Sequence, residues 1–409
     1  MTGTTTERPA PGSTTVGQRG YRLDSIDMLR GLVILLMAID HVRDFFLVGT
    51  EQDPTADPNV GAAIFFTRWI THFCAPVFVL LAGTSAGLMA ARKSRGELGR
   101  FLLTRGIWLI FVEIFVISTI VTFSPEGLPQ VGGARFAGMQ VIWAIGASMV
   151  ALSACQWMGR PACLALGLMI VAAHNLLDPF WPAATLLEEQ WPVWVALHAQ
   201  MSVRAGPFLF IFIYPVLSWI GVMLLGFGVS AVFDRPAEER NVTLIRTGAA
   251  LTGLFLVLRA LDPYGDPNHW LRQPGGSTAT LIDFLNTTKY PPSLQYLLMT
   301  LGPAAILCGL ADRMRGPVKD ALVMFGRVPF AFYVAHFFLI HTLSVLLGMA
   351  QGFSFLQMKT VFLFYPEGYG LGLAGVYVVW ATVIAVLYPF CRWVAGVKER
   401  RRDWWLSYL

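Results

Sequence analysis

The sequence predicts an all-α protein, a polytopic membrane helix bundle of about ten transmembrane helices with both termini in the cytoplasm. Hydrophobic residues make up 55% of the 409 residues and charged residues only 13%, whereas a soluble domain carries about a quarter charged residues. The charges lie in short runs between apolar stretches of about 20 residues, the length that crosses a bilayer. The lysines and arginines also favour alternate connections, which sets the orientation of the helices.

Each apolar stretch long enough to cross the membrane is a predicted span. The ninth is unusually long, and we expect it to be tilted or broken near Gly348. A helix needs about 20 apolar residues to span the hydrocarbon core. The predicted spans are 27–48, 66–91, 102–123, 138–158, 161–178, 206–232, 245–262, 292–311, 321–349 and 370–395.

The connections between these spans fall into two alternating sets. The set that includes both termini holds 19 lysines and arginines, and the other set holds five. Because basic connections stay on the cytoplasmic side, both termini are predicted to be cytoplasmic and the protein to be a multi-pass protein of the cell inner membrane. Residues 1–20 are rich in Thr, Pro and Gly and lack the apolar core of a signal peptide, which predicts a disordered cytoplasmic tail. Residues 21–409 form a single predicted domain.

Several functions are not indicated. The five cysteines show no CxxC pairing or ligand spacing, so we expect no metal. No basic stripe suggests nucleic acid as a partner. The sequence also lacks a P-loop, a dinucleotide fingerprint and the HExxH and GxSxG motifs.

The first span carries ionisable residues at both ends of a short apolar run, IDMLRGLVILLMAIDHVRDFFLV. Such groups cost several kcal/mol at membrane depth unless they are paired or hydrated, which indicates a bundle interior or a wet cavity. Eleven residues make almost three helical turns, so Arg30 and His41 share a face, about 16 Å apart. A pantetheine arm has a comparable length. Asp27, Ile34, Met37 and Asp44 lie close to the same face.

Other interpretations remain open for these residues. Asp27 and Arg30 can be interfacial anchors, and the segment Asp40–Asp44 can simply end the helix. Arg68 and His72 share a face near the end of the second span, where they can position a substrate, cap the helix or pair with Asp40 or Asp44.

Two segments, RLDSIDMLRGLVILLMAIDHVRD and THFCAPVFVLLAGTSAGL, resemble bacterial members of the heparan-alpha-glucosaminide N-acetyltransferase catalytic-domain family. That family belongs to a wider transmembrane acyltransferase group, which includes the acyltransferase family 3 proteins. FLNTTKYPPSLQYLLMTLGP and FGRVPFAFYVAHFFLIH extend the resemblance toward the C-terminus.

The resemblance implies an enzyme that moves an acyl group, typically acetyl, from cytoplasmic acyl-CoA to a hydroxyl or amine of a sugar or envelope acceptor on the outer side. Acetyl-CoA or another acyl-CoA would be the donor, and no metal is implied. The glycosaminoglycan-acting branch uses a histidine on the outer loop after the first span. This sequence has no histidine between Val42 and Thr71. The candidate catalytic histidine is therefore His41, with His72 as the second candidate.

The predicted catalytic residues are His41 as the base, Asp40 or Asp44 polarising it, and Arg30 binding the donor or orienting His41. The predicted substrate-binding residues are Arg68, His72, Asp44, Lys289, Tyr290 and His336. His336 would line the acyl path, and Lys289 and Tyr290 would form an edge for the acceptor. Membrane anchoring is the alternative for Lys289 and Tyr290, and a hydrogen bond between helices is the alternative for His336.

Two other functions fit parts of the pattern. Intramembrane Asp and His also serve proton-coupled transporters of small metabolites or glycan precursors. A non-catalytic membrane partner would have its charged residues paired between helices, with no cavity beside them. Besides the lipid bilayer, the expected partners are acyl-CoA and an extracytoplasmic glycan or other small acceptor. The acceptor, the acyl chain length and the oligomeric state, a homodimer included, stay open.

Overall fold

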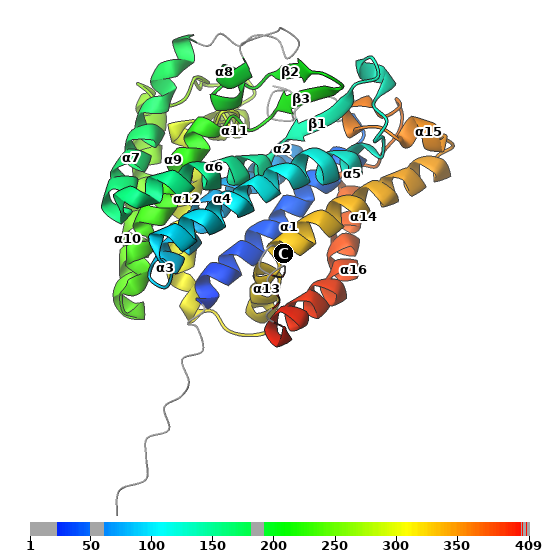
Figure 1. The fold of residues 1–409 in the computed structure, drawn as a ribbon. Coiled ribbons are helices and arrows are strands. Elements are labelled where there is room, and N and C mark those ends of the chain that lie inside the picture. Colours follow the sequence, from blue (N-terminus) through cyan, green and yellow to red (C-terminus); the bar gives the residue numbers. More distant parts are fainter. Residues whose placement is uncertain (1–22, 50–60, 181–191, 402, 404–405, 407–409) are drawn as a thin grey trace, which may run out of the picture.

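The computed structural model describes residues 23–49, 61–180, 192–401, 403 and 406; the predicted tail, residues 1–20, lies outside them. Helices dominate, and three short strands form one sheet (Figure 1). The helices are α1 Asp24–Phe46, α2 Ala62–Ile70, α3 Cys74–Ala90, α4 Arg95–Phe111, α5 Ser118–Thr122, α6 Val141–Cys155, α7 Arg160–Ala173, α8 Pro192–Leu197, α9 Val216–Val229, α10 Ala237–Leu261, α11 Ser277–Leu285, α12 Leu294–Leu310, α13 Pro317–Arg327, α14 Pro329–Ala350, α15 Phe355–Met358 and α16 Leu373–Arg400. The strands are β1 Arg135–Met139, β2 Ser202–Ala205 and β3 Phe208–Phe212.

The described residues contain nine helical stretches that are long and apolar enough to cross a membrane. Helix α1 has 23 residues and is about 35 Å long at 1.5 Å per residue, but its charged residues set it apart from these nine. It packs against α3, α12, α13, α14 and α16 near the centre of the bundle. The predicted fold class, a polytopic all-α membrane bundle, is confirmed. The nine stretches are Ala62–Ala90, Arg95–Thr122, Val141–Met158, Arg160–Pro179, Val216–Asp234, Ala237–Leu261, Leu294–Arg313, Pro329–Ala350 and Leu373–Arg400.

The sixth predicted span, 206–232, begins too early. Helix α9 starts at Val216, and the preceding segment Phe208–Phe212 is strand β3. β3 lies at the centre of the sheet, parallel to β1 and antiparallel to β2. Gly206, with φ of 56°, makes the tight turn between β2 and β3 that favours glycine. A short aromatic run of this kind is equally typical of a strand and of the start of a membrane helix.

The ninth predicted span, 321–349, is two helices. Helix α13 ends at Arg327 and α14 begins at Pro329, with Val328 between them in a non-helical conformation. Proline lacks a backbone N–H and disfavours the helical conformation of the residue before it. The break therefore lies at Pro329, and the expected break near Gly348 is wrong, because α14 continues through it to Ala350.

Two glycines bring α13 into direct backbone contact with α1. A Cβ atom on Gly31 would lie 1.8 Å from the carbonyl oxygen of Leu322, and a Cβ on Gly326 would lie 1.8 Å from that of Asp27. Helices that approach this closely need glycine at the crossing. Helix α13 is therefore held at the Asp24 end of α1, while the sheet lies toward the other end of the bundle (Figure 1). Gly83 lies against the backbone of α9 in the same way.

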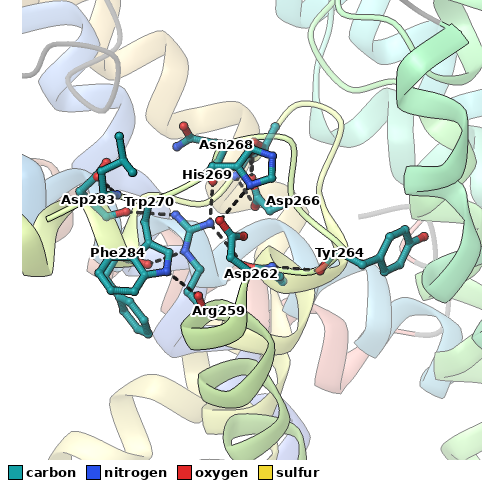
Figure 2. A network of polar contacts seen from close by, with 12 residues as sticks. Arg259, Asp262, Tyr264, Asp266, Asn268, His269, Trp270, Asp283 and Phe284 are labelled. Atoms are coloured by element: carbon teal, nitrogen blue, oxygen red, sulfur yellow. Dashed lines mark hydrogen bonds and ion pairs between the residues drawn. The ribbon is translucent and has the colours of Figure 1, made fainter.

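A buried arginine holds the connection between α10 and α12. Arg259, near the end of α10, is fully buried and donates hydrogen bonds to the carbonyl oxygens of Phe284 (2.8 Å), Asn268 (2.6 Å), Asp283 and Asn286 (both 3.0 Å) (Figure 2). A guanidinium group offers five N–H donors in a fixed plane. One side chain thus fixes both ends of the segment that leads to Lys289.

Replacing Arg259 with methionine should release this connection. The change keeps the length of the side chain and removes its donors, so we expect a loss of about 3 kcal/mol of stability, as for breaking a buried charged network. The loss would be measured by thermal unfolding in detergent, with faster proteolysis within 262–288. Arg272→Met, at an exposed position of the same connection, is the matched control. Equal unfolding of the two variants would contradict the assigned role.

Candidate active site

A cavity of about 550 Å³ runs along one face of α1. Asp27, Arg30, Ile34 and Met37 all line it, and their spacing of three or four residues places them on one side of the helix. These are four of the residues that the sequence placed on the face shared by Arg30 and His41. The other walls come from α3, α4, α6, α13, α14 and α16.

Charge is concentrated at the Asp24 end of the cavity. Arg30, Arg105, Arg327 and Lys398 line it together with the single carboxylate of Asp27. Arg30 donates to Asp27 and to the hydroxyl of Ser85, both at 3.0 Å. Deeper in, the lining side chains are mainly apolar. The cavity thus offers a cationic mouth followed by an apolar passage.

His41 lies one turn beyond Met37 on the same helix, in contact with aromatic side chains of α14. Its ring centroid is 4.3 Å from that of Phe337, 5.3 Å from that of His336 and 6.5 Å from that of Tyr333. No hydrogen bond joins Arg30 to His41 in the described structure. Arg30 and His41 therefore occupy successive positions along one path, with the apolar part of the cavity between them.

His336 is fully buried, and its hydrogen bonds determine its tautomer. Nδ1 faces the carbonyl oxygens of Tyr333 (2.5 Å) and Phe332 (3.2 Å), so the N–H lies on Nδ1 in the neutral ring. Nε2 then carries a lone pair, and it has no hydrogen-bond partner among the described residues. The structure thus brings the His336 ring beside His41, but His336 is not among the described residues that line the cavity, so its place on the acyl path stays a prediction.

Five charged residues form a cluster beside His41, called here the charge cluster: Asp40, Arg43, Asp44, Arg68 and Lys289. Arg43 lies 3.1 Å from Asp40 and 2.5 Å from Asp44. Asp40 also pairs with Arg68, and Lys289 Nζ lies 3.7 Å from its carboxylate. Among the described residues, three cations of the cluster thus surround two carboxylates.

No hydrogen bond or ion pair joins His41 to Asp40 or Asp44 among the described residues, but the Asp40 carboxylate acts on the His41 imidazole electrostatically. Residues 40 and 41 are adjacent on α1 and point about 100° apart, and both carboxylates pair with arginines. The pairing of Arg68 with Asp40 is one of the alternatives that the sequence left open. Polarisation of His41 by Asp40 or Asp44 stays a prediction.

The two remaining predicted substrate residues lie around this cluster. The His72 ring is buried 5.5 Å from that of Tyr296, which donates to the His72 carbonyl oxygen at 2.7 Å. Tyr290 packs on Tyr214, with ring centroids 5.1 Å apart, and lies beneath Lys289. Tyr290 thus touches the cluster through Lys289, and His72 follows Arg68 by about one helical turn.

A second cavity, of about 300 Å³, lies at the Phe46 end of α1 and reaches Asp44. Glu367 and the rings of Phe45, Tyr365 and Tyr369 also line it. Burial raises the pKa of the Tyr365 and Tyr369 phenols, which keeps them neutral. The two cavities thus lie toward opposite ends of α1, with the His41 region between them.

Some residues of the site were not predicted. Tyr333 lines the main cavity, and Glu113 is fully buried nearby. The sequence did contain an indication that Glu113 is unusual, because it is a single carboxylate within the apolar run WLIFVEIFVIS. Tyr333 had no such sign, because an aromatic residue in a membrane helix is ordinary.

Fold and cavity together define a multi-pass membrane protein with a ligand-sized chamber inside its helix bundle. Residues 22–259, more than half of the chain, match the heparan-alpha-glucosaminide N-acetyltransferase catalytic family. The chain belongs to this family and is an acetyltransferase-type membrane enzyme. The match contains Arg30, Asp40, His41, Arg68 and His72, and it ends before Lys289 and His336. Among curated proteins, none matches the sequence.

Proposed function

We propose that the protein transfers an acetyl group from cytoplasmic acetyl-CoA to a hydroxyl or amine of an extracytoplasmic sugar or other envelope acceptor. The observation that carries the proposal is the cavity along α1, which leads from a cationic mouth at Arg30 toward His41. Family membership supports acetyl transfer as the chemistry. The donor, the acceptor and the orientation in the inner membrane are parts of the proposal.

The shape and charge of the cavity suit acetyl-CoA. Its cations would attract the phosphates at the mouth, and the apolar passage would take the pantetheine arm. The distance from Arg30 to His41 along α1 is about 16 Å, which brings a thioester at the end of that arm close to the imidazole. A volume of about 550 Å³ lies in the usual range for small-molecule sites.

His41 is the proposed base. It would take the proton of the acceptor as the acceptor oxygen or nitrogen attacks the thioester carbonyl carbon, after which the C–S bond breaks. Lys289 and Arg68, held by Asp40, would position an acceptor that enters from the Phe46 end of α1. His336 would support His41 through the contact between their rings.

The distribution of lysines and arginines supports the proposed orientation of the protein in the membrane. The connections that are rich in Lys and Arg lie at the end of the bundle where the cavity has its cationic mouth, which supports a cytoplasmic position for that end. The site would then take its donor from the cytoplasm and its acceptor from the opposite side.

The other two functions have less support. A non-catalytic partner predicts no cavity beside the charged face of α1, yet a cavity lies there. For a proton-coupled transporter, ionisable residues would line a site at the midplane. Here the charge cluster lies at one end of α1, and its carboxylates and cations pair with one another.

The first experiment is acetyl transfer in nanodiscs. Acetyl-CoA labelled in its acetyl group would be supplied with an envelope extract, and thiol release and label transfer followed, with the acceptor identified by mass spectrometry. Saturable transfer by the wild type supports the proposal. A folded protein that neither binds nor turns over acetyl-CoA or longer acyl-CoAs would contradict it.

Filling the cavity should prevent donor binding. Ala82 lines the cavity on α3, so Ala82→Phe would place a ring in the path of the pantetheine arm. We expect acetyl-CoA to bind about tenfold more weakly or worse, a difference of about 1.4 kcal/mol, measured by isothermal titration. Ala385→Phe, at an exposed position of α16, is the matched control and should bind normally. Unchanged binding by the Ala82 variant would place the donor elsewhere.

A further inference from the structure

The break between α13 and α14 brings an arginine to the mouth of the cavity. Arg327 is the last residue of α13 and lines the cavity, while 30% of its side chain is exposed. Arg30 and Arg105 line the same cavity from α1 and α4, and Lys398 lines it from α16. The mouth thus gathers cations from helices that are far apart in the sequence.

Two carboxylates outside the cavity lie beside this arginine. Arg327 donates a hydrogen bond of 2.8 Å to Glu399, near the end of α16, and lies 3.9 Å from Asp24, the first residue of α1. Neither carboxylate is among the described residues that line the cavity, and both side chains are more than half exposed. An ion pair between such exposed side chains contributes little to stability and is weakened by salt. Another anion can therefore replace Glu399 on Arg327.

A purely structural role explains only part of this arrangement. Lys398 donates to the backbone carbonyl oxygen of Arg327 at 3.3 Å, which by itself holds the end of α16 against the break. Arg30 pairs with Asp27, and both residues line the cavity. Arg327 instead lines the cavity while its carboxylate partner, Glu399, lies outside. A side chain needed only for a surface ion pair has no reason to contribute to the cavity wall.

Phosphate is the anion that suits this position. CoA carries a diphosphate and a 3′-phosphate on its adenosine, whereas the pantetheine arm is uncharged. A guanidinium group offers N–H donors in a fixed plane and binds phosphate through paired, charge-assisted hydrogen bonds. A phosphate at the mouth would also be attracted by the other cations that line it. It should therefore displace a single exposed carboxylate from Arg327.

We propose that Arg327 determines the specificity for the phosphorylated end of the donor, and that Glu399 competes with the donor for this arginine. The guanidinium pairs with Glu399 until acetyl-CoA enters, and a phosphate of the donor then replaces the carboxylate. The inference rests on the proposed function, in which acetyl-CoA is the donor. Both residues lie beyond residues 22–259, so membership of the family does not assign them this role.

The direct test replaces Arg327 with methionine, which keeps the apolar stem of the side chain and removes its charge. We expect acetyl-CoA to bind about tenfold more weakly in nanodiscs, measured by isothermal titration. Acetyl-pantetheine, which carries no phosphate, should bind the variant as it binds the wild type, measured by competition. The matched control is Arg315→Met, which removes an exposed cation just before α13 that does not line the cavity. It should bind both ligands normally.

Replacing Glu399 with glutamine should have the opposite effect. The change removes the competing charge and leaves Arg327 in place, so we expect acetyl-CoA to bind about threefold more tightly, with acetyl-pantetheine unaffected. Glu126→Gln breaks a similarly exposed pair, with Lys359, which lines neither of the two cavities. This control should leave the binding of both ligands unchanged.

Lipid headgroups also carry phosphate, so binding is compared in nanodiscs of phosphatidylcholine with and without phosphatidylglycerol. The effect of Arg327→Met should be the same in both. Equal losses for acetyl-CoA and acetyl-pantetheine, an effect confined to phosphatidylglycerol, or a Glu399→Gln variant that binds acetyl-CoA no more tightly would each overturn the inference. Wild-type protein that binds no acetyl-CoA would instead contradict the proposed function itself.

Discussion

Replacing His41 with glutamine should lower acetyl transfer about 10³-fold, because removal of a general base typically costs 10²–10⁴-fold in rate. The acceptor would then have to attack the thioester without losing its proton. His41 does not line the donor cavity, so acetyl-CoA should bind the variant as it binds the wild type. The measurement is single-turnover transfer of labelled acetyl groups, with donor binding determined in parallel.

The matched control is His269→Gln. His269 is largely exposed and pairs with Asp262, 2.8 Å away (Figure 2). Its loss should leave transfer unchanged. If His41→Gln folds, binds acetyl-CoA and keeps more than about a tenth of the wild-type rate, His41 is not the base.

Alanine at Gly31 should destabilise the whole bundle. The added methyl group would lie 1.8 Å from the carbonyl oxygen of Leu322, which is backbone and cannot rotate away. Overpacking a core costs about 1–3 kcal/mol and more where a backbone must shift, so we expect a clear fall in the thermal unfolding temperature. Because α1 and α13 both contribute to the cavity, binding of acetyl-CoA should weaken as well.

Gly253→Ala provides the comparison within a helix. Gly253 lies inside α10, and a Cβ built there meets no atom within 4 Å. Alanine has a higher helix propensity than glycine by about 1 kcal/mol, so this variant should unfold at the wild-type temperature or above it. Equal behaviour of the Gly31 and Gly253 variants would show that α1 and α13 do not meet as described.

The sequence predicted well those features of the site that depend on the geometry of a single helix. The spacing of Asp27, Arg30, Ile34 and Met37 follows from helical geometry alone, and the structure confirms that these four residues share the face that lines the cavity. The helix break at Pro329 could also have been predicted from the sequence, because proline disfavours the helical conformation of the residue before it. It was missed because the apolar composition continues through the break.

The site could not be predicted where it depends on contacts between distant segments. Asp40 meets Arg68 and Lys289, from two other parts of the chain, and the sequence offered the Arg68 pairing only as one of several alternatives. The contact of His41 with Phe337 and His336 likewise joins α1 to a helix far from it in sequence. Such contacts depend on which helices are neighbours, which hydropathy and residue spacing do not specify.

The hydrogen bonds of Arg259 have a consequence for the substitutions that this protein can accept. Four of its hydrogen bonds end on backbone carbonyl oxygens of residues 268–286, and every amino acid has such an oxygen. The anchor therefore fixes the path of the connection without specifying its sequence. Exposed residues such as Leu271 and Arg272 can therefore be varied while the segment stays in place. A library of substitutions at these positions should keep the path of the chain that leads to Lys289.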